Sequence, residues 1–210
     1  MRAPSITGVV LAAGGSRRLG TPKQLLSYRD TTLLGATLRV ARGAGFDQLI
    51  VTLGGAAQRV RALVPLDEAE VVTVEDFGAG CSASLRVARC ALRVARCALR
   101  VALGRVDPQS AGIVLMLGDQ PGVDPATVAR LVGQGPGCDL MVCRYNDGIG
   151  HPFWFSRRLF GELTQLHGDK GVWKLIQSGR HPVRELVVDD SVPLDVDTWD
   201  DYRRLVESVP

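Results

Sequence analysis

The sequence predicts a three-layer α/β fold built on a mostly parallel sheet, and three observations lead to this class. Short apolar segments rich in β-branched residues recur along the chain, as strands buried on both faces do. Segments with helical periodicity separate these apolar runs. The length of 210 residues and a hydrophobic content of 46% suit one globular domain, residues 1–210, with a sizeable core.

The expected strands and helices alternate along the chain. Strands are expected over Ile6–Ala13, Asp47–Leu53, Ala69–Val74, Gly112–Leu117 and Cys138–Tyr145. Helices are expected over 31–45, 56–64 and 124–132, and over the arginine-rich segment before the fourth strand. Because ligands of such folds bind at the carboxyl ends of the strands, functional residues should follow the apolar runs.

The arginine-rich segment contains a repeat. Residues 85–91 (LRVARCA) recur unchanged at 92–98, and LRVA begins a third copy at Leu99. Seven added residues turn a helix by only about 20° relative to its buried face and lengthen it by about 10 Å. A coiled coil needs at least three heptads. We therefore interpret the repeat as a tandem duplication within a helix. The extra turns should project away from the ligand crevice or locally displace their neighbours.

Charge and cysteine content argue against several classes of function. The formal net charge of +3, without a concentrated basic stripe, does not indicate a nucleic-acid partner. The five cysteines include no Cys-x-x-Cys pair, so reduced thiols are expected rather than disulfides or a zinc site. No segment approaches the roughly 18 apolar residues of a membrane span, and the N-terminus lacks a signal core. We expect a cytoplasmic protein without a membrane partner.

The first candidate site is the loop AAGGSRRLGTPK, which follows the first expected strand. Gly14, Gly15 and Gly20 let backbone N–H groups approach a ligand, while three residues add positive charge: Arg17, Arg18 and Lys23. Only three of the 25 basic residues are lysines, so the chain generally uses arginine for surface charge. The choice of lysine at position 23, which we expect to be an exposed loop cation, therefore favours a point-charge role on phosphate. The spacing fits neither the P-loop nor G-x-G-x-x-G. A glycine-rich turn with solvated arginines is the alternative.

Aspartates provide the second candidate site. Asp119 follows the expected strand 112–117 directly, where a carboxylate can bind Mg²⁺ together with phosphates and water. Near the C-terminus, Asp195 and Asp197 occupy alternate positions of an expected strand, and a helix should start at about Thr198. Simple turn chemistry at Asp119 and helix capping by Asp197 or Thr198 are the alternatives.

These motifs resemble the signature of the MobA-like NTP transferase family, roughly L-A-[AG]-G-x-[SG]-x-R-[ML]-G-x-x-K, and within it the molybdenum cofactor cytidylyltransferases. The matching positions are Leu11, Ala12, Ala13, Gly14, Ser16, Arg18, Leu19, Gly20 and Lys23. The resemblance implies a Rossmann-like nucleotide-diphospho-sugar transferase fold. It also implies that this loop, including Gly15, wraps an NTP triphosphate while Arg18 and Lys23 neutralise the leaving pyrophosphate.

The resemblance continues downstream. It implies that Asp119, in a G-D-x-P element, is a magnesium ligand and contacts the nucleotide, and that Asp197 is a second metal ligand. His151, expected just before an aromatic strand, and Asp169, before a short helix, fit G-x-x-G-H-P and G-D-x-G elements on the acceptor side. The segment 74–85 departs from the family at Val74, Cys81 and Ala83. Its nucleotide-binding positions Gly80 and Ser84 fit the family.

The function implied by this resemblance is transfer of CMP from CTP to molybdopterin cofactor, with Mg²⁺ and release of pyrophosphate. CTP is preferred because Leu11-Ala12-Ala13-Gly14 resembles the cytidylyltransferases, whereas guanylyltransferases tend to carry Leu-Ala-Gly-Gly. A molybdoenzyme or its maturation factor is considered as a further partner. The alternatives are transfer to another phosphorylated acceptor, an NAD(P)H-dependent oxidoreductase, and a non-catalytic cofactor-binding protein.

Overall fold

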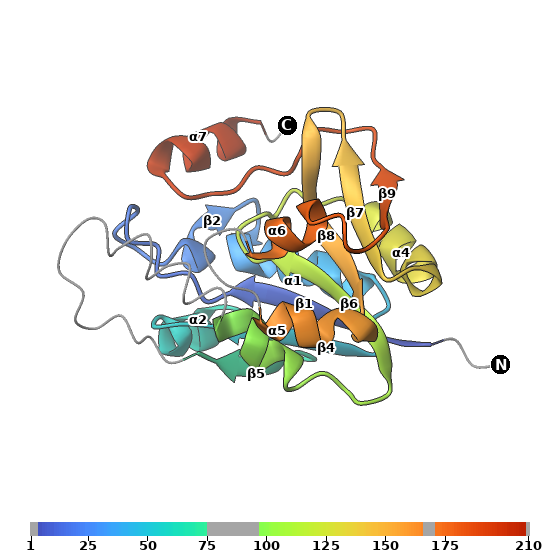
Figure 1. Ribbon diagram of the computed structural model, residues 1–210. Helices are drawn as coiled ribbons and strands as arrows, with labels where there is room; N and C mark the ends of the chain where they lie inside the picture. The colour runs from blue at the N-terminus through green and yellow to red at the C-terminus, as the bar shows by residue number, and fades with distance from the viewer. Residues whose placement is uncertain (1–3, 75–96, 166–170, 209–210) are drawn as a thin grey trace.

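The computed structural model describes residues 4–74, 97–165 and 171–208. In this part of the chain, a seven-stranded sheet has the order β5-β4-β1-β6-β8-β7-β9, and helices cover both of its faces (Figure 1). The three-layer α/β fold is therefore confirmed. The repeat at 85–98 lies outside the described residues apart from its last two, which are helical together with residues 99–103.

The sheet is mostly parallel, as predicted. Its strands are β1 (Ser5–Ala12), β4 (Gln48–Leu53), β5 (Glu70–Thr73), β6 (Ser110–Leu117), β7 (Leu140–Tyr145), β8 (Gly148–Ser156) and β9 (Val183–Val187). β1 runs parallel to β4 and β6, β4 to β5, and β7 to β9. Only β8 is antiparallel to its neighbours β6 and β7. A separate two-stranded sheet joins β2 (Ser27–Tyr28) and β3 (Thr31–Thr32).

The helices begin where the sequence supplies capping groups. The α-helices are α1 (Leu33–Gly43), α2 (Ala57–Leu63), α4 (Pro125–Gln134), α5 (Phe160–Gln165), α6 (Gly171–Gln177) and α7 (Trp199–Glu207). The 3₁₀ turns are η1 (Lys23–Leu25), η2 (Gly135–Gly137) and η3 (Arg157–Leu159). Asp124 accepts the Thr127 N–H, so it caps α4, whose first residue is a proline. Thr198 forms a capping box with Asp201 at the start of α7.

Two apolar cores lie on opposite faces of the sheet. On one face, α1, α2 and α4 pack against β1 and β6 through residues such as Val10, Met116 and Leu38. On the other, the helical segment 97–103, α5 and α6 pack against Leu115 and Phe153. Alternate residues of a strand point to opposite faces, so strands between two cores must be apolar throughout. This explains the continuous apolar runs in the sequence.

Two local predictions are wrong. His151 and Pro152 do not precede the aromatic strand but lie within β8, because the pairing of β8 with β7 continues back to Gly148. Asp195 and Asp197 do not lie on a strand, because the chain from 191 to 198 has no strand partner. Val196 of this irregular segment is fully buried in a small core with Leu19 and Leu205, and this packing holds the segment in place.

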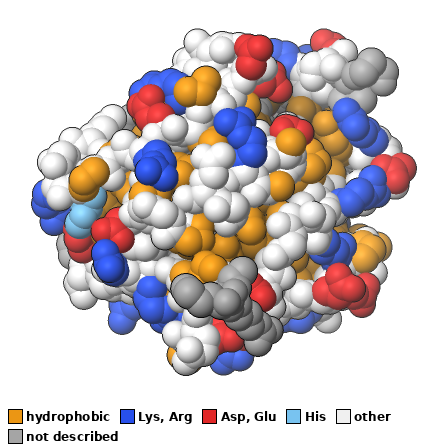
Figure 2. Space-filling model, turned by 90° about the vertical axis from the view of Figure 1, so that its right-hand side faces the viewer, with side chains coloured by type: hydrophobic (Ala, Val, Ile, Leu, Met, Phe, Trp, Pro, Cys, Tyr) orange, Lys and Arg blue, Asp and Glu red, His pale blue; other side chains and the backbone are white. Residues whose placement is uncertain are grey.

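The surface carries mixed charge on the face shown in Figure 2. There, Lys and Arg side chains alternate with Asp and Glu around a hydrophobic area. Within residues 4–74, 97–165 and 171–208, no helix combines the length and apolar character that crossing a membrane requires.

Gly54 offers a test of how closely β4 approaches the loop after β1. A Cβ atom at this position would lie 2.2 Å from the Ala13 carbonyl oxygen, and a backbone atom cannot move aside cheaply. We expect Gly54→Ala to lower the free energy of unfolding, measured by urea titration, by about 1–3 kcal/mol. Gly43→Ala is the matched control because a Cβ there meets nothing within 4 Å, and equal stability of the two variants would contradict the prediction.

Candidate functional site

A cavity of about 170 Å³ lies at the carboxyl ends of β1 and β6, where the sequence predicts ligand binding. Six of the predicted nucleotide-binding residues line it: Leu11, Ala12, Ala13, Gly14, Lys23 and Asp119. Four further residues complete the lining: Gln24, Ala98, Leu117 and Gly118. The glycine-rich loop and the turn after β6 thus meet at one small cavity.

The ammonium group of Lys23 lies at the centre of this site. Its Nζ atom donates to Asp119 Oδ2 and, at 2.8 Å, to Asp197 Oδ1. Arg18 Nη2 donates to the other oxygen of Asp197 at 2.7 Å. Two of the three basic residues of the loop thus meet the two predicted metal ligands, although these come from distant parts of the chain.

Burial and charge act against each other at Lys23. The prediction that this residue is an exposed loop cation is wrong, because only 13% of its side chain is exposed, and only 15% of that of Asp119. Burial alone would lower the pKa of Lys23, but Asp119 and Asp197 outweigh burial and raise it above its ordinary value. Burial likewise opposes ionisation of Asp197, yet Lys23 and Arg18 lower its pKa. Lys23 and Asp197 are therefore both charged at neutral pH.

The carboxylates of Asp119 and Asp197 fit a divalent cation in their donor chemistry. Both carboxylates accept a hydrogen bond from Lys23 Nζ, so they are close enough for one ion with its water ligands to span them. Asp195 lies nearby, and burial together with the charge of Asp119 raises its pKa to about 6. Within the described ranges, no three His, Cys, Asp or Glu side chains gather closely enough to form a complete metal site. Phosphate oxygens and water would have to complete the coordination.

The glycine-rich loop has a defined shape between β1 and η1. Ser16 adopts a positive φ of 47° and Gly20 one of 67°. The Lys23 N–H donates to Ser16 Oγ at 2.9 Å, which ties the two ends of the loop together. Gly15 and Arg18 are exposed and lie outside the cavity lining. The loop therefore presents its first residues to the cavity and Arg18 to the rim.

His151 lies at the same edge of the sheet. The antiparallel pairing of β8 with β6 ends at Phe153 and Leu115, so His151, two residues before Phe153, lies towards the carboxyl end of β6, where Leu117 lines the cavity. The imidazole packs on the Phe153 ring with the centroids 4.1 Å apart. Burial lowers the pKa of His151 to about 3, so the ring is neutral and can only donate or accept hydrogen bonds.

Three predicted site residues lie outside the described part of the chain: Gly80, Ser84 and Asp169. The short helix predicted after Asp169 is confirmed as α6, whose Trp173 ring meets the Phe153 ring edge-on at 5.5 Å. This contact brings the start of α6 close to the strand that carries His151.

Two buried glutamines were not identified from the sequence as residues of the site. Gln24 and Gln120 directly follow Lys23 and Asp119, and only 4% and 2% of these glutamines is exposed. Gln120 Nε2 donates to the Pro193 carbonyl at 3.0 Å, which links the turn after β6 to the segment that carries Asp197. Their positions directly after two charged site residues could have drawn attention to them. A glutamine in a turn is normally exposed, however, so their burial could not be predicted.

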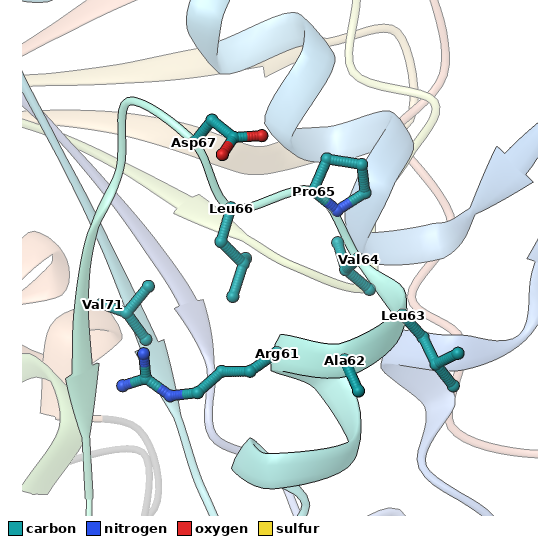
Figure 3. A pocket seen from close by; sticks show the side chains of 8 residues that line it. All are labelled: Arg61, Ala62, Leu63, Val64, Pro65, Leu66, Asp67 and Val71. Carbon is teal, nitrogen blue, oxygen red and sulfur yellow. The ribbon is translucent and has the colours of Figure 1, made fainter.

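A larger cavity of about 620 Å³ lies between the end of α2, the loop after it and β5 (Figure 3). Its lining is mostly apolar, and its charged members are Arg61 and Asp67. Arg61 is engaged with Thr73 Oγ1 at 3.3 Å. This cavity lacks the convergent charged groups that mark the site at Lys23.

The fold and the site together define a class of protein. A glycine-rich loop, two cations and two carboxylates meet at the carboxyl edge of a three-layer α/β sheet. The family model of the MobA-like NTP transferase domain matches residues 8–183, and the chain belongs to this family.

Solved structures of similar proteins agree with the fold. Rv0371c from Mycobacterium tuberculosis H37Rv is 68% identical to this chain, with a TM-score of 0.86 over 99% of this chain and 100% of that one. A structure of Rv0371c in complex with manganese shows 65% identity and a TM-score of 0.83 at the same coverage. The structure of that relative therefore contains a divalent metal.

Two curated relatives differ in their named activities. Nicotine blue oxidoreductase from Paenarthrobacter nicotinovorans is 33% identical over 136 residues, which cover 64% of this chain and 59% of that protein. A probable molybdenum cofactor guanylyltransferase from Bacillus cytotoxicus is 33% identical over 73 residues, which cover 35% of this chain and 34% of that protein. Similarity to these relatives is confined to part of each chain.

Removal of Lys23 should destabilise the fold, because it leaves Asp119 partly buried without its counter-charge. We expect Lys23→Met to lower the free energy of unfolding by about 1–3 kcal/mol. The double variant with Asp119→Asn should lose less than the sum of the two single losses, as a urea-unfolding cycle can measure. Arg39→Met, which breaks an exposed pair with Asp30, should change stability little, and strictly additive losses at Lys23 and Asp119 would rule out the buried pair.

The neutral state of His151 predicts a pH effect on stability. Its pKa falls from about 6.5 in the unfolded chain to about 3 in the folded one, so below pH 6.5 only the unfolded chain takes up the proton. The stabilisation is complete above pH 6.5 and is lost as pH falls towards 3. Urea titrations should show that His151→Gln loses about 1–2 kcal/mol less stability than the parent chain between pH 7 and pH 5. Parallel pH profiles of the two proteins would refute a buried neutral imidazole.

Proposed function

We propose that the chain transfers a CMP group from CTP to a molybdopterin-type acceptor and releases pyrophosphate. The observation that carries the proposal is the meeting of Lys23 with Asp119 and Asp197 beside the glycine-rich loop. Nucleotidyl transfer needs cations for the triphosphate and carboxylates for its metal ion. The family description and the named guanylyltransferase relative support a molybdenum cofactor role.

In the proposed reaction, an oxygen of the acceptor's phosphate attacks the α-phosphorus in line. The bond from the α-phosphorus to the bridging oxygen of the β-phosphate breaks, and pyrophosphate leaves with the electron pair. Lys23 and Arg18 move from the carboxylates to the triphosphate and neutralise the charge that grows on the leaving group. A divalent cation held by Asp119 and Asp197 would supply Lewis-acid polarisation of the phosphates. No covalent intermediate with a side chain is needed.

The side chain of Ala13 favours a pyrimidine over a purine as the base of the bound nucleotide. Its side chain is buried and packs in a small cluster with Val74 and Ala98 at the wall of the cavity. This methyl group narrows a space that glycine would leave wider for a purine. His151 and Asp169 are proposed for the acceptor side, where the neutral imidazole offers hydrogen bonds but no positive charge.

An NAD(P)H-dependent oxidoreductase remains the second candidate, favoured by the name of one relative. The two candidates differ in what they consume. Absorbance at 340 nm during titration with NADPH detects hydride transfer, whereas pyrophosphate release detects nucleotidyl transfer. NADPH oxidation without pyrophosphate release would replace the transferase proposal.

Pyrophosphate release with each of the four NTPs, with and without molybdopterin cofactor, tests the transferase directly. We expect release with CTP in the presence of acceptor and divalent metal. Asp119→Asn should lower kcat about 10²-fold or more, and Asp197→Asn, which is half exposed, about tenfold. Asp30→Asn, at an exposed ion pair, is the matched control. Full activity of Asp119→Asn would remove this residue from the metal site.

Base choice can be tested at Ala13. Ala13→Gly widens the wall of the cavity, so the ratio of kcat/KM for CTP to that for GTP should fall by roughly tenfold. Competition between the two nucleotides in one assay measures this ratio. An unchanged ratio would show that the base is selected elsewhere.

A further inference from the structure

We infer that Gln24 is a positioning residue that sets the glycine-rich loop for binding phosphate oxygens. The inference rests on the triphosphate role proposed above. It assigns a task to a side chain that belongs to none of the motifs used to find the site.

The side chain of Gln24 holds two carbonyl groups of the loop at once. Its Nε2 donates to the carbonyl oxygen of Ala12 at 2.6 Å and to that of Gly14 at 3.0 Å. The residue is 4% exposed, so water does not compete for these donors. Both hydrogens of the amide are therefore committed to the loop backbone.

The oxygen of the same amide lacks a hydrogen bond, and burying it in this state is unfavourable. Gln24 Oε1 is buried and has no hydrogen-bond partner. An apolar side chain of similar size would fill the space without an unsatisfied oxygen. Rotation of the amide would only set Oε1 against two carbonyl oxygens. The two donated hydrogen bonds, rather than packing, are therefore what this glutamine contributes.

We call the two hydrogen bonds from Gln24 Nε2 to the loop the glutamine clamp. Because of peptide geometry, this clamp orients backbone N–H groups that can bind an anion. In a planar trans peptide, the N–H points opposite to the C=O. Holding the carbonyls of Ala12 and Gly14 towards Gln24 therefore turns the N–H groups of Ala13 and Gly15 away from it, on the other side of the loop. In the described part of the chain, neither N–H donates to another protein atom. Two such N–H groups in a glycine-rich loop suit a phosphate oxygen.

The clamp also links the loop to the charge at the centre of the site. Gln24 is the neighbour of Lys23, whose own N–H holds Ser16 Oγ. The short turn η1 thus sends Lys23 Nζ to the carboxylates and the Gln24 amide to the loop. One turn fixes the cation and the backbone donors relative to each other.

Binding of inorganic tripolyphosphate tests the inference without base, acceptor or metal. In calorimetry with EDTA present, we expect Gln24→Met to bind tripolyphosphate about tenfold more weakly than the parent chain. Gln24→Glu should bind more weakly still, because its carboxylate faces two carbonyl oxygens. Gln48→Met is the matched control, since the amide of this glutamine donates to Glu70 and to the Arg105 carbonyl at the amino end of β4 and not to the loop, and its affinity should stay near that of the parent chain.

A measurement on the unmodified chain covers the case in which Gln24 variants do not fold. In NMR titrations with tripolyphosphate, the amide resonances of Ala13 and Gly15 should shift strongly. Unchanged affinity in Gln24→Met, or absence of these shifts at saturation, would overturn the role of Gln24 and leave the proposed transferase standing. Failure of the unmodified chain to bind either tripolyphosphate or CTP would overturn both.

Discussion

The ammonium group of Lys23 is the interaction on which the architecture of the site depends. It joins Asp119 from the turn after β6 to Asp197 from the segment before α7, so it connects an early, a middle and a late part of the chain. A positive charge with so little exposure is stable only beside counter-charges. The loop after β1 must therefore fold down onto the turn after β6. The same requirement brings the C-terminal segment across the edge of the sheet.

Much of the fold could be predicted because the sheet is buried on both faces. Apolar runs such as Gly112–Leu117 leave no polar face for solvent, and this signal depends on sequence alone. β9 could not be found in this way, since its sequence, VRELV, places charged side chains on an exposed edge strand. The segment around Asp195 has the alternation of a strand, but its shape is set by burial of Val196 against distant residues. Such tertiary contacts leave no local pattern.

The site likewise contains residues that could be predicted from the sequence and residues whose role depends on tertiary contacts. Residues that follow strands in glycine-rich turns, such as Gly14 and Asp119, could be predicted because topology brings strand ends together. The burial of Lys23 could not be predicted, because lysine in a loop is normally solvated and only its two aspartate partners reverse this. The importance of Gln24 could not be predicted from its position beside Lys23, since it lies in hydrogen bonds to two backbone carbonyls that the sequence does not distinguish.

Among the described strands of the large sheet, only β8 runs antiparallel to its neighbours, and this has a consequence for how such a protein can diversify. On one side of it, β1 and β6 deliver their following loops to the ligand edge, whereas β8 delivers its first residues, Gly148 to His151, to the same edge. The preceding hairpin turn and the segment around Val192, which touches Gly150, thus form a module of their own. Exchange of this module leaves the hydrogen bonds between β1, β4 and β6 intact. Members of one family can therefore keep one half of the edge constant while the other half acquires a different specificity.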